Sequence, residues 1–435
     1  MNIQQAKQEI KHTVKAYLQK DTTGNYKIPL LRQRPILMMG PPGIGKTQIM
    51  EQIASECGIG LVAYTITHHT RQSAVGLPFI KEEEFNSKRY SITEYTMSEI
   101  IASIYKKMKD TDIQEGILFI DEINCVSETL APTMLQFLQY KTFGNQAVPD
   151  GWIIVTAGNP PEYNKSVRDF DMVTLDRVRR MDLEPDLPAW KEYAREQGIL
   201  PSILSYLDIR PKNFYRVESD VDGLSFVTAR GWEDLSTLLA VYKELNIAVT
   251  EEIVSEFLSH EDVAQDFTAY YDLYRKYEDD YGISDILHGN VRPDIYARIF
   301  EAQFDERITV VHLLYDGLRQ KFAKIYKTKT FVDEWFRELQ MEQGQQNDSK
   351  EQFQEQAAWL EQMELEAETM LSQAFNFMEQ AFENGQEMVV FVTELTMGAE
   401  SASFLKDYPN EKYINYNREL LIGTKKAELL KELQE

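Results

Sequence analysis

The sequence of 435 residues contains only two cysteines, Cys57 and Cys125. Two thiols cannot build the disulfide framework of a small secreted domain, so the composition predicts a protein of the reducing cytosol. The N-terminal segment MNIQQAKQEIKHTVKAYLQK lacks the apolar stretch of a secretory signal. No apolar run in the sequence approaches the roughly 18 residues that a helix needs to cross a bilayer. We therefore expect a cytoplasmic protein without a membrane segment.

Basic residues are also scarce. The chain has 46 Lys and Arg against 70 Asp and Glu, a net charge of -24. A protein that coats DNA or RNA needs a basic surface, so direct binding to nucleic acid is not expected. The segment from Met341 to Glu435 alone holds 7 basic and 19 acidic residues, so it carries half of that net charge. A local positive site for a small anion stays compatible with this composition.

Short apolar runs alternate with helical patterns between residues 35 and 185. Runs that are apolar at nearly every position are typical of parallel strands covered on both faces. Their alternation with helices predicts a doubly wound α/β fold. Beyond Pro188 the strands stop and helical patterns dominate, and Met1–Lys20 has the spacing of an amphipathic helix. The expected strands are 35–40, 60–66, 116–121 and 151–158, and the expected helices between them are 46–57, 96–109 and 130–141.

A glycine-rich loop follows the first apolar run and precedes a helical one. It matches G-x-x-x-x-G-K-[ST], the pattern of a phosphate-binding loop. Glycines let backbone N–H groups wrap around a polyphosphate, and the N-terminus of the next helix adds its positive dipole. The lysine reaches the β- and γ-phosphates, and the threonine hydroxyl ligates Mg²⁺. The residues of this loop are Gly40, Pro41, Pro42, Gly43, Ile44, Gly45, Lys46 and Thr47.

Two neighbouring acids, Asp121 and Glu122, end the apolar run GILFID. Ligands of open α/β sheets bind at the carboxyl ends of the strands, where these acids would lie. We expect Asp121 to hold Mg²⁺ and Glu122 to orient and deprotonate an attacking water. Alone, the pair is equally typical of a strand followed by a solvated acidic turn. Its occurrence after a phosphate-binding loop favours the catalytic interpretation.

Asn159 and Arg230 complete the set of candidate catalytic residues near the phosphates. Asn159 follows the fourth apolar run in the turn Gly-Asn-Pro, where its amide can hold the lytic water and sense the γ-phosphate. The same turn is also common without any catalytic role. Arg230 lies where the helical pattern from Ala229 begins, so its guanidinium is available to a phosphate.

A cluster of arginines at 175–180, Leu-Asp-Arg-Val-Arg-Arg, stands out in this acidic chain. The pattern predicts a helix that starts at 166–169 and ends in this cluster. Two interpretations stay open. The arginines can complement the dipole at a helix C-terminus, or one of them can reach into a neighbouring subunit as an arginine finger.

Taken in order, these motifs resemble those of an AAA+ ATPase, most closely of the MoxR-like branch. The resemblance implies a five-stranded α/β core, a helical lid, ATP sites between subunits of a usually hexameric homo-oligomeric ring, and a chaperone-like role. Proteins of this branch often act on a client that contains a von Willebrand A domain. The matching segments are GPPGIGKT (40–47, Walker A), ILFIDEIN (117–124, Walker B), TAGNP (156–160, sensor 1), LDRVRR (175–180, arginine finger) and TARGWE (228–233, sensor 2).

The finger motif departs from the family pattern. The family commonly has LDRF, whereas Val178 follows Arg177 here. Arg177 matches the motif position best, and Arg179 and Arg180 stay open as alternatives. The segment from His68 to Pro78 resembles the loop insert of this branch only loosely.

The resemblance and the composition together give five expected regions. We expect the nucleotide site in the second region and its lid in the third. The regions are an N-terminal helix and linker (1–34), the α/β nucleotide-binding core (35–186), the helical lid (187–270), a helical extension (271–340) and an acidic helical C-terminal region (341–435).

The sequence thus predicts an enzyme that hydrolyses ATP with Mg²⁺ and remodels a protein partner. Two alternatives stay open: an ATP-dependent assembly switch or scaffold with little turnover, and a nucleic-acid motor of the same superfamily. The presence of Glu122 favours the first interpretation, because a pure switch could dispense with a residue that activates water.

Overall fold

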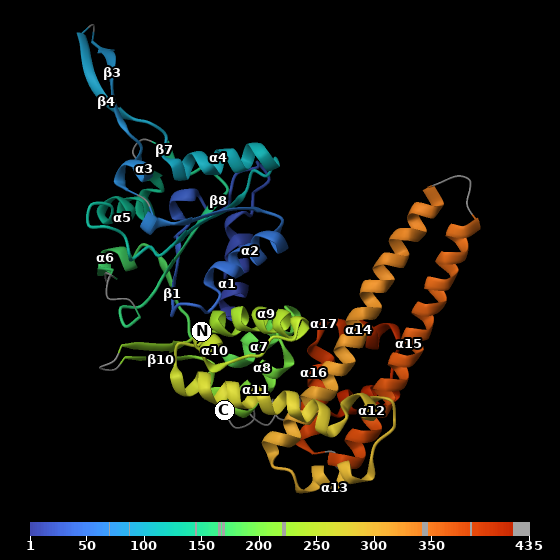
Figure 1. Cartoon of the computed structure of the whole chain (residues 1–435). Coiled ribbons are helices and arrows are strands. Elements are labelled where there is room, and N and C mark those ends of the chain that lie inside the picture. Colours follow the sequence, from blue (N-terminus) through green and yellow to red (C-terminus); the bar gives the residue numbers. More distant parts are fainter. Residues whose placement is uncertain are drawn as a thin grey trace, which may run out of the picture. The chain divides into compact units, whose positions relative to one another are not determined.

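The computed structural model of the chain describes residues 1–68, 70–86, 88–143, 146–163, 167, 170–219, 223–341, 347–382 and 385–420. The chain divides into two compact units (Figure 1). The first consists of Met1–Ala189 and Thr228–Arg230, and the second of Trp190–Val227 and Gly231–Glu435. Of the helix start expected at 166–169, the structure describes only Val167.

The first unit is built on a five-stranded sheet in which every pairing is parallel. All four predicted strands are present, and with the helices around them they confirm the doubly wound α/β class. The strands are buried because both faces of the sheet are covered. In spatial order they are β2 (Gly60–Thr65), β5 (Gly116–Asp121), β8 (Trp152–Gly158), β1 (Ile36–Met39) and β9 (Arg179–Asp182).

Strand β9 corrects the helix predicted to end in the arginine cluster. Helix α6 spans only Met172–Leu175, and residues 179–182 pair with β1. The register places Ile36 opposite Arg179 and Met38 opposite Met181. The open edge of β1 offers this segment a full row of backbone hydrogen bonds, which a short helix cannot match. Local sequence does not reveal that edge, so the prediction of a helix that ends in the arginine cluster is wrong.

The predicted helices of the first unit form close to their expected bounds. Helix α1 begins with a capping box in which Asn2 accepts from the backbone of Gln5. Figure 1 shows α1 and α2 on one side of the sheet and α5 on the other. The helices are α1 (Ile3–Tyr17), α2 (Lys46–Cys57), α4 (Glu99–Thr111) and α5 (Ala131–Tyr140), with short pieces η1 (Leu30–Arg32), η2 (Ile66–His68) and α3 (Arg71–Val75) and the two-residue strands β6 (Thr142–Phe143) and β7 (Gln146–Ala147).

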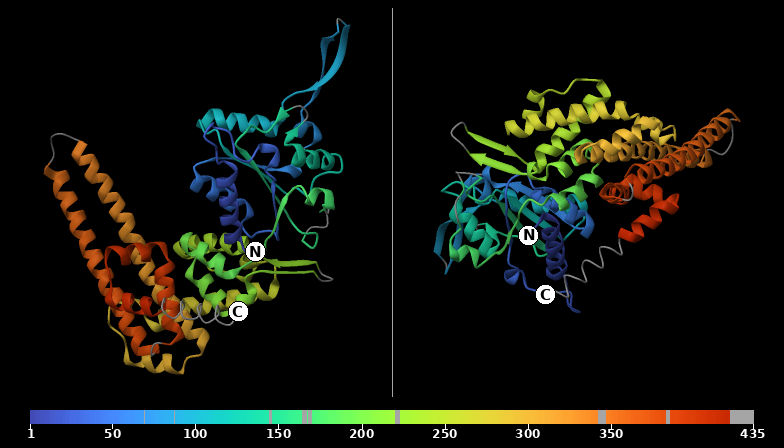
Figure 2. Two further views of the ribbon diagram at one scale, coloured as in Figure 1. Left: turned by 180° about the vertical axis from the view of Figure 1, so that it is seen from behind. Right: turned by 90° about the horizontal axis from the view of Figure 1, so that it is seen from below.

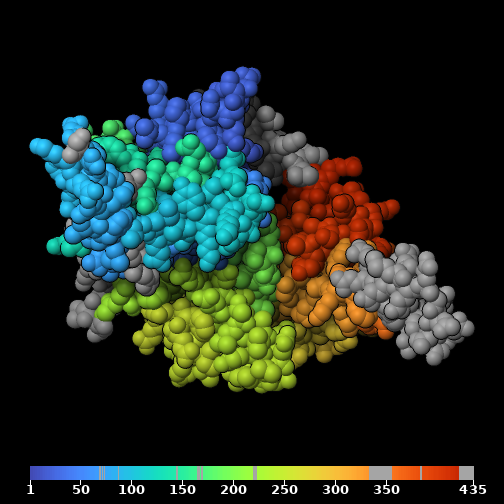
Figure 3. Space-filling view, turned by 90° about the horizontal axis from the view of Figure 1, so that it is seen from above, coloured from blue at the N-terminus to red at the C-terminus, as the bar shows by residue number. Residues whose placement is uncertain are grey.

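A hairpin that the sequence did not reveal projects from the first unit (Figure 1). Its antiparallel strands are β3 (Pro78–Phe85) and β4 (Lys88–Tyr95). Several large apolar side chains on it are exposed, with Ile80 at 79%. Figure 3 looks down on this hairpin, whose side chains form the light-blue part of the surface. The hairpin follows the segment 68–78 that loosely resembled a loop insert, of which His69 lies outside the described residues.

The second unit is helical, apart from one small hairpin. Strands β10 (Arg216–Ser219) and β11 (Leu224–Val227) pair antiparallel, which corrects the expectation that no strand follows Pro188. The helices are α7 (Leu187–Glu196), α8 (Pro201–Ile209), η3 (Pro211–Asn213), α9 (Ala229–Leu245), α10 (Glu251–Ser255), α11 (Glu261–Tyr281), α12 (Ile283–Leu287), α13 (Pro293–Glu301), α14 (Phe304–Met341), α15 (Asn347–Phe382), α16 (Gln386–Met397) and α17 (Ala399–Asp407).

One apolar core unites the helices from α11 onwards. It extends from Tyr274 to Leu405, so residues before and after position 341 pack together in it. The long helices α14 and α15 run side by side in both views (Figures 1 and 2). Among the described residues no single helix is long and apolar enough to cross a membrane, and α16 with α17 meets that test only as a pair bent by 85°. In the unit both helices contribute buried side chains, such as Phe391 and Phe404, to the core.

Candidate active site

The phosphate-binding loop lies between β1 and α2, as its sequence predicts. It turns through two glycines with positive φ, Gly43 (71°) and Gly45 (91°), a conformation that L side chains rarely adopt. Gly43 is also closely packed, because a Cβ there would lie 2.8 Å from Cβ of Thr228. At the start of the loop, Gly40 N donates to Gly158 O (3.2 Å). The loop is therefore fastened to β8 and shaped by its glycines.

The ammonium group of Lys46 lies buried inside this loop. Nζ donates to the carbonyl oxygens of Gly40 (2.7 Å) and Pro41 (2.8 Å) and to Oδ1 of Asn159 (2.9 Å). All three N–H donors are used. Burial lowers the pKa of Lys46 to about 8, and the nearby charge of Asp121 opposes that shift. A polyphosphate entering the loop would compete for these donors and would favour the charged amine.

Thr47 and Asp121 meet at the adjoining strand end. Thr47 Oγ1 donates to Asp121 Oδ2 (3.0 Å), and Asp121 Oδ1 accepts from the backbone N–H of Glu122 (2.8 Å). A hydroxyl and a carboxylate are the hard oxygen ligands that Mg²⁺ takes in nucleotide sites. The donor set present therefore fits the expected magnesium ion.

Glu122 has a left-handed backbone with φ 56°, which is unusual for a residue other than glycine. Such a conformation costs about 1–3 kcal/mol and persists only where the surroundings hold it. Its carboxylate accepts from Thr67 Oγ1 (2.8 Å). Sequence reasoning missed Thr67. The available signal was a polar residue two positions after the end of β2, the strand that neighbours β5 in the sheet.

Asn159 lies at the carboxyl end of β8, as predicted. Its side chain accepts from Lys46, and its backbone oxygen accepts from Nδ2 of Asn124 (2.8 Å). Asn124 was part of the quoted Walker B segment, but sequence reasoning gave it no role. Arg230 also lies by the loop. Its backbone N–H donates to Gly43 O (3.1 Å), and its charge contributes to the lowered pKa of Lys46.

The three arginines of the finger motif have different surroundings. Arg177 is exposed, and its Nη1 donates to Gln139 Oε1 on α5 (2.6 Å). This hydrogen bond is to a residue outside the phosphate-binding loop. Arg179, on β9, pairs with Glu9 of α1 (2.5 Å), and Arg180 pairs with Asp182 (2.8 Å). Of the three, Arg177 is the one that lies in the turn between α6 and β9.

A comparison with protein-family models decides the class of the domain. Residues 36–174 match the family described as ATPase family associated with various cellular activities (AAA). The chain carries an AAA ATPase domain. The matched range contains the phosphate-binding loop, Asp121, Glu122 and Asn159, whereas Arg177 and Arg230 lie beyond it. No curated protein is similar enough to the chain to count as a match.

The matched domain is that of an ATPase family, as its motifs led us to expect. Three neighbouring strands of this domain, β5, β8 and β1, end at the same edge of the sheet. This edge brings together the loop, the two acids and Asn159, in agreement with the rule that ligands of parallel α/β sheets bind at the carboxyl ends of strands.

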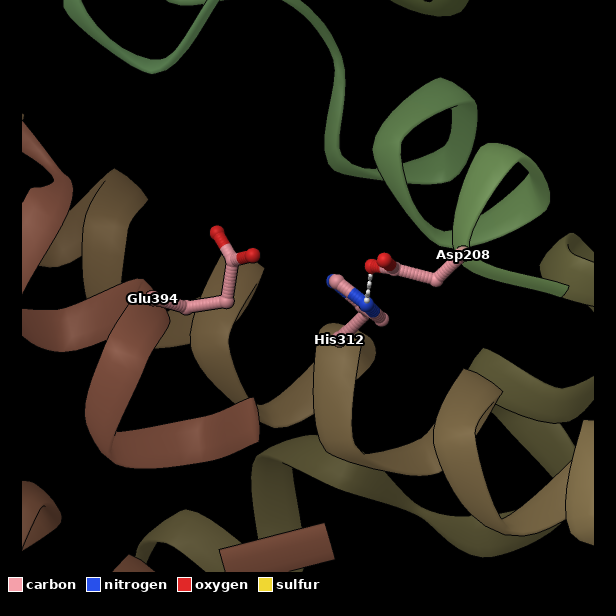
Figure 4. A group of neighbouring side chains, drawn as sticks. All are labelled: Asp208, His312 and Glu394. Atoms are coloured by element: carbon pink, nitrogen blue, oxygen red, sulfur yellow. Dashed lines mark hydrogen bonds and ion pairs between the residues drawn. The ribbon is translucent and has the colours of Figure 1, made fainter. Parts of the chain in front are cut away.

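A second charged cluster lies within the helical unit. Figure 4 shows Asp208, His312 and Glu394 approaching one another from α8, α14 and α16. Their potential ligand atoms all lie within 4.8 Å of one another, which is close enough to consider a metal ion. His312 Nε2 donates to Asp208 Oδ2 (3.1 Å), Lys191 pairs with Asp208, and Arg195 forms a double contact with Glu394 at 2.5 and 2.9 Å.

The formal charges of this cluster cancel when His312 is neutral. Lys191 and Arg195 already neutralise the carboxylates of Asp208 and Glu394, so a divalent cation would add charge that nothing compensates. We therefore interpret the cluster as structural. Burial by itself would raise the pKa of Glu394, yet the hydrogen bond from Arg195 leaves it below its usual value. The fold thus favours the ionised carboxyl. Its stabilising contribution is present at neutral pH and is lost as the pH falls below the usual carboxyl value of about 4.

The first prediction concerns Lys46. Replacing it by Ala removes the ammonium that joins the loop to Asn159, so we expect ATP affinity to fall by at least about tenfold and hydrolysis to cease. Lys15→Ala, in an exposed part of α1, is the matched control and should leave both unchanged. Affinity is measured by titration with a fluorescent ATP analogue and turnover by phosphate release. Unchanged affinity in Lys46→Ala would contradict the assigned loop.

The second prediction concerns the charged cluster. Arg195→Met leaves Glu394 buried without its partner and should lower the free energy of unfolding by about 3–5 kcal/mol. The double variant Arg195→Met with Glu394→Leu should recover most of this loss, because it leaves no buried charge without its partner. Calorimetric unfolding measures both. Arg292→Met, which breaks an exposed pair with Asp294, serves as the control and should cost less than about 1 kcal/mol. Equal losses in the single and double variants would argue against a buried ion pair.

Proposed function

We propose that this chain binds ATP with Mg²⁺ at the edge formed by β1, β5 and β8, and uses hydrolysis to remodel a protein partner. The observation that supports this most is the hydrogen-bonded series from the loop through Lys46 to Asn159, beside the Thr47–Asp121 contact. In this series the ammonium of Lys46 and the amide of Asn159 lie beside two oxygen groups that could hold a metal ion, those of Thr47 and Asp121. Phosphoryl transfer needs little more than such positioning and charge stabilisation.

Each residue has a defined task in this proposal. The loop amides and Lys46 hold the β- and γ-phosphates, and Thr47 with Asp121 would hold the magnesium ion. When bound, Mg²⁺ neutralises charge that develops on the phosphates. Glu122 orients the attacking water and accepts its proton. Asn159 keeps that water in line.

Lys46 and Glu122 both form hydrogen bonds within the protein that they must exchange for bonds to the phosphates and to water when ATP binds. Lys46 donates to its own loop, so it turns from those carbonyls to the phosphates when ATP binds. The carboxylate of Glu122 accepts from Thr67 and must be able to reach a water as well. Arg230 begins α9 beside Gly43, where its guanidinium can contact a γ-phosphate. In this proposal residues 187–270 act as the lid over the nucleotide.

We further propose that the chain assembles into a homo-oligomeric ring, of hexameric size, with Arg177 acting on the neighbouring subunit. AAA proteins commonly form oligomers. The helix before Arg177 exposes apolar side chains, Met172 at 86% and Val173 at 55%. Exposed apolar side chains beside an arginine are typical of a surface that contacts another chain. Arg179 and Arg180 have acidic partners in their own chain and are weaker candidates for the finger.

The partner to be remodelled is, in this proposal, a protein, as in the MoxR-like branch, where clients often contain a von Willebrand A domain. The hairpin β3–β4 supports a protein client, because it presents exposed apolar residues such as Phe79, Ile80 and Phe85. The acidic composition gives no support to a nucleic-acid motor. A switch that binds ATP and assembles with little turnover is the second candidate function.

The third prediction separates the motor from the switch. In Glu122→Gln, ATP should still bind, because the loop and Lys46 are intact, while phosphate release falls by at least about a hundredfold. Glu128→Gln, in the loop that follows β5, is the matched control and should retain turnover. Negligible release in the wild type, with assembly that still follows ATP, would instead support the switch.

The fourth prediction tests where Arg177 acts. Arg177→Ala and Lys46→Ala subunits should each be inactive alone, yet regain part of the turnover when mixed. Recovery is expected because an intact site on one subunit then receives its arginine from the other. Phosphate release is measured over a range of mixing ratios at constant total protein. Absence of recovery would mean that Arg177 acts within its own subunit or is not the finger.

A further inference from the structure

Asn124 is a buried polar residue to which the proposed reaction assigns no task. It is 2% exposed and lies in the turn that follows Glu122. Two hydrogen bonds fasten this turn to β8. Ile123 N donates to Ala157 O (2.9 Å), and Asn124 Nδ2 donates to Asn159 O (2.8 Å). The turn that carries the acids is therefore tied to the strand end that carries Asn159.

The other half of the Asn124 amide has no hydrogen-bond partner among the described residues. Its Oδ1 is buried, and a Cβ on Gly158 would lie only 2.5 Å from it. An unsatisfied buried acceptor is unfavourable, and an apolar residue of similar size would avoid that cost. Because the structure tolerates this cost, the single bond from Nδ2 to Asn159 calls for an explanation beyond packing.

That bond joins Asn124 to a residue that contacts Lys46. The backbone oxygen of Asn159 accepts from Asn124, while its side-chain oxygen accepts from Lys46 Nζ. Asn159 is thus held from both ends, between the Walker B turn and the phosphate-binding loop. A shift of its backbone by a few tenths of an ångström would lengthen the contact to Lys46, and hydrogen bonds weaken quickly with poor geometry.

We propose that Asn124 is a positioning residue that holds Asn159 in the orientation needed for hydrolysis. This rests on the proposed function, in which Asn159 keeps the attacking water in line. Asn124 acts only through Asn159. It also links Asn159 to the turn of Asp121 and Glu122, so that the metal ligand, the residue that activates water and the polar amide keep one geometry. Gly158 makes this possible, because a Cβ would clash with the Asn124 amide.

The test replaces Asn124 by Leu, which removes the amide, and by Asp, which keeps its shape but turns an acceptor toward Asn159 O. We expect the dissociation constant of an ATP analogue to change by less than about twofold, because the loop is intact, and kcat to fall by about tenfold in both variants. Asn213→Leu, which removes a hydrogen bond to Tyr206 in the helical unit, is the matched control and should leave kcat unchanged.

A double-mutant cycle with Asn159→Ala separates positioning from general stability. If Asn124 acts through Asn159, then Asn124→Leu causes no further fall in kcat once Asn159 is Ala. A purely structural role would instead give independent effects that multiply. Melting temperatures are measured for every variant, and Asn124→Asp decides the question if Asn124→Leu unfolds below the assay temperature.

The outcomes distinguish this inference from the function on which it rests. If Asn159→Ala lowers kcat but neither Asn124 variant does, the positioning role is overturned and the proposed function stands. If Asn159→Ala leaves kcat unchanged while Glu122→Gln abolishes turnover, the role of Asn159 is wrong and the inference falls with it. A weaker binding of the ATP analogue in step with kcat would also overturn it, because the effect would then lie in the loop.

Discussion

The buried ammonium of Lys46 is the constraint around which the α/β unit is organised. A charged amine inside a protein is unfavourable unless its hydrogen bonds are made, and burial lowers its pKa to about 8. Here two carbonyls of the loop and the amide of Asn159 supply those bonds. The carbonyls converge only because Gly43 and Gly45 turn the chain through positive φ. The shape of the loop and the position of Asn159 therefore depend on each other.

Strand order supplies the rest of the site. Because β5, β8 and β1 are neighbours, residues far apart in the chain end at one edge of the sheet. The turn after β5 then places Asp121 against Thr47 and Glu122 against Thr67. Both backbone polar groups of Glu122 are hydrogen-bonded: its N–H donates to Asp121 Oδ1, and its carbonyl oxygen accepts from Cys125 N. The result is a site whose polar groups contact one another at one edge of the sheet, and positioning of this kind is the main contribution a protein makes to phosphoryl transfer.

Among the described residues of the C-terminal segment (341–435), most acidic side chains are exposed or half-buried. In α15 the buried residues Met363, Ala367 and Met370 recur at helical spacing, whereas the neighbouring Glu361 and Glu368 are exposed. The charges thus form a solvated face over an apolar core. Two acids of this segment, Glu387 and Glu394, are buried, and each is paired with an arginine, Arg307 and Arg195 respectively. The acidity of the whole chain does not oppose nucleotide binding, because Lys46 and the amides of the loop supply positive charge locally.

Local patterns predicted a large part of this protein. The four apolar runs became strands, the helix of residues 46–57 formed at its expected bounds, and the loop that joins them was evident from its glycines and lysine. These features depend on neighbours in the chain, so their residues carry the signal. The arginine cluster at 175–180 shows the limit. Its pattern predicts the end of a helix, but Arg179 and Arg180 belong to the edge strand β9, which pairs with the open side of β1.

What the sequence by itself determined was the class of the domain and the identity of its phosphate-binding loop, because both are written in contiguous residues. The tertiary structure alone decided which distant groups complete the site. The sequence did not show which residues Thr67 and Asn124 contact, and their bonds to Glu122 and Asn159 follow from strand order. The same holds for the pairing of Arg195 with Glu394. Hydrogen bonds between residues far apart in the chain leave no periodic trace in the sequence, so only the folded arrangement could reveal them.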